Sequence, residues 1–202
     1  MKKGLFITFE GIDGCGKTTQ IKLLDEYIRK NGGETLLTRE PGAQGLGAKL
    51  REILLNYNGD ISSVCESFLF LADRAQHVDC IIKPAIFQNK IVLCDRHADS
   101  TVAYQGYGRE LNIDRINLLN NIATSGLKPD LTILLDIDVE TSILRVGKNQ
   151  DRMEASGVEF FNRVRNGYLN IAKQNPDRVK VISASDTIEN IHRKIVELVE
   201  NL

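Results

Sequence analysis

The chain has 202 residues, enough for one domain with its own hydrophobic core. Its formal net charge is −1, so nothing in the overall charge points to a nucleic acid or a membrane surface as a partner. The apolar run near the N-terminus is too short for a signal peptide, and no run approaches the roughly 20 apolar residues of a membrane span. The four cysteines have no C-x-x-C spacing, which predicts a reduced, cytoplasmic protein rather than a disulfide framework or a zinc site.

A phosphate-binding loop follows the first apolar run. Leu5–Phe9 predicts a buried strand, and the residues after it match the pattern G-x-x-x-x-G-K-[ST] in full. In such a loop, glycines let backbone N–H groups surround a phosphate. Lys17 adds a positive charge beside the β- and γ-phosphates, and the Thr18 hydroxyl can hold Mg²⁺. The predicted triphosphate site comprises Gly11, Ile12, Asp13, Gly14, Cys15, Gly16, Lys17 and Thr18.

Apolar runs alternate with helical stretches along the rest of the chain. The further predicted strands are Glu34–Thr38, Ile91–Asp95, Leu131–Asp136 and Val179–Ser183. Helical stripes occur at Leu46, Leu50, Ile53 and Leu54, and at Ile188, Ile191, Ile195 and Leu198. The alternation predicts an α/β fold: one domain over residues 1–202, with a five-stranded parallel sheet covered by helices on both faces. Ligands then bind beyond the carboxyl ends of the strands.

Charged residues follow the second and third predicted strands. Arg39 and Glu40 precede a Pro-Gly turn. The two charged residues are either a functional pair at the ligand edge of the sheet or a solvated ion pair. Asp95 ends an apolar strand and is placed to hold Mg²⁺, and Arg96 offers a planar fork to a phosphate. A structural Asp–Arg pair is the alternative. We interpret His97 as a packing or surface residue.

Two further segments could contact a nucleotide. On a helix, Phe70 and Arg74 would share one face, where the ring could stack on a base and the cation could hold a phosphate. The alternative interpretation is that Phe70 belongs to the hydrophobic core and that Arg74 lies at the surface. The basic stretch from Arg145 to Arg152 predicts a charged lid over about residues 145–156, or an ordinary solvated loop.

Taken together, these segments resemble the thymidylate kinase family over nearly the whole chain. The matching stretches are Phe9-Glu10-Gly11-x-Asp13-Gly14-x-Gly16-Lys17-Thr18, Arg39-Glu40-Pro41-Gly42, Ala72–His77, Asp95-Arg96, Ser100-x-x-Ala103-Tyr104-Gln105-Gly106 and Asp151-Arg152. The resemblance implies a P-loop fold of the nucleoside monophosphate kinase type. It implies phosphoryl transfer from ATP, with Mg²⁺, to dTMP, giving dTDP and ADP for dTTP biosynthesis. It also implies a homodimer, formed through the helix containing Phe68–Gln76 and its neighbours.

The resemblance also assigns roles to single residues. The implied catalytic residues are Asp13, Lys17, Arg39, Arg96 and Arg152. The ATP site gains Arg145 together with Ala184 and Ser185, which lie where the family holds adenine. The implied dTMP site comprises Asp13, Arg39, Arg51, Phe70, Arg74, Arg96, Thr101, Tyr104 and Gln105. Within it, Arg39, Arg74 and Arg96 are cations for phosphate and transfer, Phe70 stacks on thymine, and Arg51, Thr101 and Gln105 read its edge. Thr18 and Asp95 would hold Mg²⁺.

Two details separate this chain from parts of the family. Its phosphate loop lacks the arginine that one subgroup of the family carries near Cys15. In this respect the chain resembles the other, mostly bacterial subgroup, which supplies this cation from the lid. Arg145, Lys148 and Arg152 fit that arrangement, and Arg152 is the first candidate. Ala43 stands where the family often has a second glycine. An alanine with positive φ would be strained by roughly 1 kcal/mol, so the local turn can differ.

Two other functions share part of this pattern. A deoxynucleoside kinase would use Glu10 or Glu40 as a base toward a 5′-hydroxyl, whereas Arg39, Arg74 and Arg96 favour a monophosphate acceptor. A nucleotide-dependent switch module would need a γ-phosphate-sensing loop with a water-positioning glutamine, which we do not identify in the sequence.

Overall fold

The computed structural model describes residues 4–147, 152–153 and 156–202. Within these ranges, the strands form one sheet in the order β2-β3-β1-β4-β5, and all neighbours are parallel. The strands are β1 (Leu5–Glu10), β2 (Thr35–Arg39), β3 (Ile91–Asp95), β4 (Leu131–Asp136) and β5 (Val179–Ser183). The predicted five-stranded parallel sheet is therefore confirmed, although β2 begins and ends one residue later than expected and β1 extends to Glu10.

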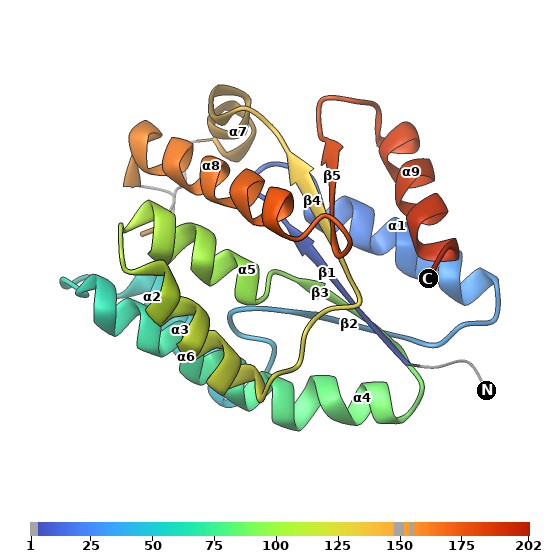
Figure 1. Ribbon diagram of the computed structural model, residues 1–202, viewed down its shortest axis with the longest axis horizontal. Coiled ribbons are helices and arrows are strands. Elements are labelled where there is room, and N and C mark those ends of the chain that lie inside the picture. Colours follow the sequence, from blue (N-terminus) through green and yellow to red (C-terminus); the bar gives the residue numbers. More distant parts are fainter. Residues whose placement is uncertain (1–3, 148–151, 154–155) are drawn as a thin grey trace.

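Helices cover both faces of the sheet. Between the strands and after them lie α1 (Lys17–Lys30), α2 (Leu46–Asn56), α3 (Ser63–His77), α4 (Lys83–Phe87), α5 (Ala98–Thr101), α6 (Ile113–Thr124), α7 (Val139–Val146), α8 (Val158–Gln174) and α9 (Ile188–Glu200), with the π-helical segments η1 (Val78–Ile82) and η2 (Val102–Gly108). Helices α1 and α9 pack side by side on one face, while α4 and α8 pack on the other (Figure 1). None of the described helices is long and apolar enough to cross a membrane.

The core explains why the strands are nearly continuous apolar runs. Both faces of the central strands are covered, so Phe6 and Ile7 on β1 and Ile133 on β4 are all inaccessible to solvent. Full burial of each such side chain contributes about 1.5–3 kcal/mol. Helix α2 is different, because Leu54 is buried whereas Leu46 and Ile53 of its predicted stripe are exposed. Its apolar pattern therefore overstated how much of this helix faces the core.

The carboxyl ends of β1, β2 and β3 meet at one edge of the sheet and bring the predicted site together. The loop after β1 needs glycine at Gly11, whose φ is 134° and whose added Cβ would lie 2.4 Å from the Leu135 carbonyl oxygen. Gly16 has φ 97° and ends the loop where α1 begins at Lys17. The backbone N–H of Glu40, after β2, donates to the Asp95 carbonyl at the end of β3.

Candidate active site

The phosphate loop opens into a cleft with about 950 Å³ of empty space. Its lining residues are Asp13, Gly14, Gly16, Lys17, Thr18, Thr19, Arg39, Glu40, Arg51, Asp95, Arg96 and Arg145. The Lys17 Nζ atom lies 3.1 Å from the Gly11 carbonyl oxygen and 3.3 Å from that of Ile12, so the ammonium group sits within the loop. The side chains of Ile12 and Cys15 are buried in the hydrophobic core. Their backbone N–H groups are therefore the parts of these residues that can bind a ligand.

Thr18 and Asp95 form a pair suited to a magnesium ion. The Thr18 hydroxyl lies 3.4 Å from Asp95 Oδ2, and the buried Oδ1 atom has no hydrogen-bond partner in the described structure. Magnesium typically takes one or two protein oxygens together with water and substrate phosphates. Among the described residues, no group of three or more His, Cys, Asp or Glu side chains could hold a metal ion by itself. The predicted pair therefore fits a metal that is shared with a nucleotide.

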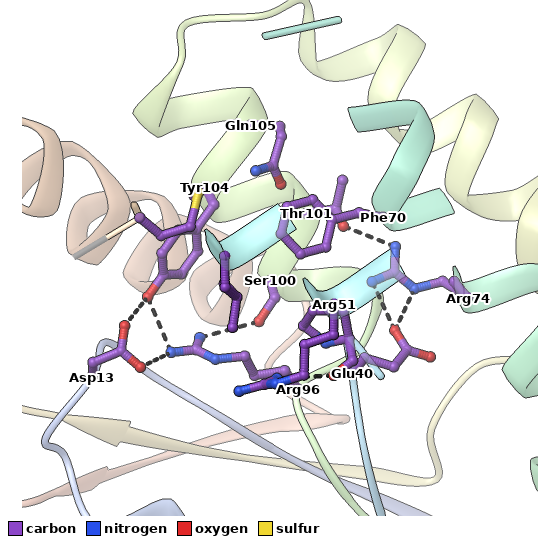
Figure 2. A pocket seen from close by; sticks show the side chains of 13 residues that line it. Asp13, Glu40, Arg51, Phe70, Arg74, Arg96, Ser100, Thr101, Tyr104 and Gln105 are labelled. Carbon is purple, nitrogen blue, oxygen red and sulfur yellow. Dashed lines mark hydrogen bonds and ion pairs between the residues drawn. The ribbon is translucent and has the colours of Figure 1, made fainter. Parts of the chain in front are cut away.

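A second pocket, with about 570 Å³ of empty space, adjoins the cleft. Its lining residues are Asp13, Glu40, Pro41, Arg51, Leu55, Phe70, Arg74, Arg96, Ser100, Thr101, Tyr104, Gln105 and Met153 (Figure 2). Every residue predicted for the dTMP site lines this pocket except Arg39, which lines the cleft. Asp13, Glu40, Arg51 and Arg96 line both cavities, so the two meet at these side chains.

Arg96 anchors the boundary between the cavities. One of its nitrogens lies 2.6 Å from Asp13 Oδ1 and 3.1 Å from the Tyr104 hydroxyl, which in turn donates to Asp13 Oδ2 (Figure 2). Burial alone would raise the pKa of Asp13, but Arg96 and Lys17 lower it to about 2. Arg96 itself has φ 70°, a left-handed conformation that is uncommon in a residue with a side chain and often marks a functional site.

Arg74 is buried in the wall of the pocket, and all five of its N–H donors are engaged. Nε and Nη2 each lie 2.8 Å from Glu40 Oε2, and Nη2 also donates to the His97 carbonyl at 3.0 Å. The two protons of Nη1 reach Thr101 Oγ1 and Asn120 Oδ1 at 2.8 and 2.6 Å. This geometry leaves Arg74 no donor for a phosphate, so the expected phosphate role does not follow, although the residue does line the pocket.

The two carboxylates considered as bases are both buried and hydrogen-bonded. Glu40 accepts hydrogen bonds from Arg74, His77 and His97, and although burial raises its pKa, Arg74 and His97 hold it well below the usual range. Glu10 accepts from the His97 N–H, Ser100 and Tyr168, and burial raises its pKa to about 7. Glu40 already has two donors on each carboxylate oxygen, and Glu10 lines neither cavity, which argues against the deoxynucleoside kinase. His97 is buried, in line with a packing role and not a surface one.

The described lid residues occupy two different places. Arg145 reaches the Gly14 carbonyl at 3.3 Å and the Ala184 carbonyl at 3.5 Å, between the phosphate loop and the predicted adenine position. Arg152 instead lies 2.7 Å from Glu66 and donates to the Leu54 carbonyl at 2.8 Å. Lys148 lies outside the described residues. Action of Arg152 on a transferred phosphoryl group would require it to leave Glu66, whereas Arg145 already lines the cleft.

Several site residues were not among the predicted ones. Ser100 and Met153 line the pocket, and Glu66 lies behind it. A signal for Glu66 was present, since it precedes Phe70 by one turn of α3 within an apolar stretch. The turn after β2 differs from the family pattern without strain, because Gly42 has φ 90° while Ala43 is not among the residues with positive φ.

Comparison with known proteins agrees with this geometry. The family model described as thymidylate kinase matches residues 9–195. A thymidylate kinase of Maridesulfovibrio salexigens is 50% identical over 201 residues, covering 95% of this chain and 93% of that protein. One from Thermoanaerobacter sp. is 47% identical and covers 98% of each chain. The crystal structure of thymidylate kinase from Ehrlichia chaffeensis superimposes with a TM-score of 0.83 at 40% identity, covering 98% of each chain. The protein belongs to the thymidylate kinase family, and its fold is the P-loop fold of nucleoside monophosphate kinases.

Proposed function

We propose that this protein transfers the γ-phosphoryl group of MgATP to dTMP, which yields dTDP and ADP for dTTP synthesis. The observation that carries the proposal is the junction of the two cavities at Asp13, Arg51 and Arg96. A triphosphate on the loop and a monophosphate in the pocket would there bring their phosphates face to face. Phosphoryl transfer depends mainly on such positioning and on charge.

The donor side of the mechanism is supplied by the phosphate loop. Its backbone N–H groups and Lys17 hold the β- and γ-phosphates, and the positive end of the α1 dipole adds to them. Thr18 and Asp95 would hold Mg²⁺, which neutralises charge on the phosphates when bound. A cation from the lid, Arg145 or Arg152, completes the charge balance. Such a cation is worth about 10³–10⁵ in rate in related phosphoryl transfers.

The acceptor side is supplied by the pocket. Arg39 and Arg96 are cations for the dTMP phosphate, with Arg96 held in place by Asp13 and Tyr104. Phe70 offers a face for the thymine ring, and Thr101, Arg51 and Gln105, which line the same pocket, would read its edge. No strong base is required, because the acceptor is already a charged phosphate oxygen.

We also propose that residues 1–202 act as one domain and that two copies form a homodimer in the cytoplasm. Support for the dimer comes from exposed apolar side chains on α3, namely Val64 and Phe68. The cytoplasm is supported by the four cysteines, all of which are free. Neither a nucleic acid nor a membrane is expected as a partner, given the net charge of −1.

The test is an ADP-release assay with MgATP and a panel of acceptors: dTMP, dCMP, dGMP, AMP and thymidine. We expect dTMP to give by far the highest kcat/KM. A preference for thymidine over dTMP would overturn the proposal in favour of a deoxynucleoside kinase. The variant Lys17→Ala serves as the inactive control, because it removes a charge at the phosphates, and circular dichroism checks that it stays folded.

A further inference from the structure

Glu66 is a buried carboxylate that lies behind the base end of the pocket and has no part in the mechanism above. Its side chain is 1% exposed. It comes from α3, one turn before Phe70, so it shares the helix face that lines the pocket. A buried carboxylate is costly unless hydrogen-bond donors surround it.

Among the described residues, the side chains that contact the Glu66 carboxylate are all donors. Oε1 accepts from Nε2 of Gln105 at 2.9 Å and lies 3.3 Å from Nε of Arg109. Oε2 lies 2.7 Å from Nη2 of Arg152 and 3.4 Å from Nη2 of Arg109. Both oxygens therefore act as acceptors, and the nitrogen end of the Gln105 amide must face Glu66.

The partners of Glu66 are themselves held by other elements. The guanidinium of Arg109 lies 4.5 Å above the ring of Phe160 on α8. Arg152 also donates to the Leu54 carbonyl on α2. Glu66 is therefore fixed from several directions, and it cannot turn with the Gln105 side chain. The orientation of this amide is set by its surroundings before any nucleotide binds.

Because the amide nitrogen of Gln105 is bound to Glu66, the amide oxygen is the group that can contact a ligand in the pocket. Gln105 lines the pocket with Phe70 and Thr101, and its amide points toward the space between Tyr104 and Phe70 (Figure 2). A carbonyl oxygen accepts hydrogen bonds only. Thymine has a ring N–H on its pairing edge, whereas the matching ring nitrogen of cytosine carries a lone pair, which a carbonyl oxygen repels.

We propose that Glu66 is a positioning residue for base selection: by holding Nε2 of Gln105, it presents the amide oxygen to the base and so favours a pyrimidine with a ring N–H over cytosine. The proposal rests on the function proposed above, since it concerns the acceptor of the same site. Gln105 contacts the base, and Glu66 acts only through it.

The variant Glu66→Gln tests this orientation. Its amide has one acceptor oxygen, for which Arg109 and Arg152 compete, so its NH₂ group turns toward Gln105. Gln105 then turns its oxygen to residue 66 and its NH₂ group to the base. We expect the ratio of kcat/KM for dTMP to kcat/KM for dCMP to fall roughly tenfold or more, the effect of one unmade hydrogen bond. The loss should appear mainly as a higher KM for dTMP.

The double variant Glu66→Gln/Gln105→Glu is the rescue. It presents a carboxylate oxygen to the base while residue 66 donates to it, so the preference for dTMP over dCMP should return. The double variant also keeps one carboxylate beside Arg109 and Arg152. It can therefore be measured even if the single variant unfolds. The matched control is Asp99→Asn, which removes a partly buried carboxylate 2.6 Å from Arg178, outside the base pocket, and should leave the ratio unchanged.

Steady-state kinetics with both nucleotides, beside thermal unfolding of each variant, decide the outcome. The proposal is overturned if Glu66→Gln loses dTMP and dCMP activity by the same factor, or if a folded double variant shows no preference for dTMP. Either result would mean that Glu66 has only a structural role. The proposed function would still stand, because the wild type would retain its activity on dTMP. A wild-type protein without dTMP activity would overturn the proposed function and this inference together.

Discussion

At the scale of single residues, Glu10 gives the fold a predictable dependence on pH. Burial raises its pKa from 4.5 to about 7, so the folded protein binds this proton more tightly than the unfolded chain does. The stability that Glu10 contributes is therefore fully present below about pH 4.5 and is lost as pH rises through about 7. Its partners at Ser100 and Tyr168 are hydroxyls, which can accept a hydrogen bond as well as donate one.

We therefore expect Glu10→Gln to remove part of the pH dependence of folding. The free energy of unfolding of the wild type should fall relative to the variant between about pH 4.5 and 7, by at most about 3 kcal/mol at ~1.4 kcal/mol per pH unit. Urea unfolding at several pH values measures this difference. Glu34→Gln, at an exposed position, is the control and should run parallel to the wild type. Parallel curves for Glu10→Gln would mean that Glu10 titrates normally.

Some of the proposed site residues can be recognised from the sequence more directly than others, for a physical reason. Lys17, Thr18 and Asp95 follow from local patterns, because a phosphate loop and the end of a buried strand carry their chemistry in a few adjacent residues. The phosphate role expected for Arg74 does not depend on a local pattern in this way. The N–H donors of Arg74 are taken by residues from other segments, namely Glu40, Thr101, Asn120 and His97. No spacing along the chain reveals that saturation.

At the scale of elements, the two described candidates for the transfer cation lie on α7 and at position 152. Arg145 lies in the last turn of α7 beside the phosphate loop, whereas Arg152 is paired with Glu66. We expect Arg145→Ala to lower kcat by on the order of 10³ with little change in KM for dTMP, since the charge is needed in the transition state. Arg152→Ala should lower kcat less.

Single-turnover and steady-state kinetics of both variants separate the two residues. Arg193→Ala, at an exposed site on α9, is the charge-matched control and should behave as the wild type. If Arg152→Ala lowers kcat more than Arg145→Ala does, the transfer role belongs to Arg152. That ranking would also mean that Arg152 leaves Glu66 during the reaction.

The elements themselves were predictable where burial dominates. Strands β3 and β4 are mainly apolar and lie inside the sheet, covered on both faces, and they match their predicted bounds. The edge strand β5 is half exposed but also matches its predicted bounds. Helix α2 was less well predicted, because Leu46 and Ile53 are apolar yet exposed. The π-helical segments η1 and η2 had no signal in the periodicity, since they depend on how neighbouring helices pack.

At the scale of the whole molecule, the described residues leave an apolar surface on α3 and α6 exposed. Val64 and Phe68 on α3 are 54% and 55% exposed, and Leu118 and Ile122 on α6 are 61% and 65% exposed. The two helices pack against each other, so these side chains can form one patch. An exposed patch of this kind is typical of an interface, and a second copy of the chain could cover it through a two-fold contact.

We expect the wild type to sediment as a dimer and Phe68→Glu to sediment as a monomer. The substitution would bury two like charges at the contact, and each costs several kcal/mol of the association free energy. Phe87→Glu on α4 is the control, because Phe87 is 91% exposed but lies on another helix, and this variant should remain dimeric. Sedimentation velocity measures the masses. A monomeric wild type, or a dimeric Phe68→Glu, would exclude the α3 surface as the dimer contact.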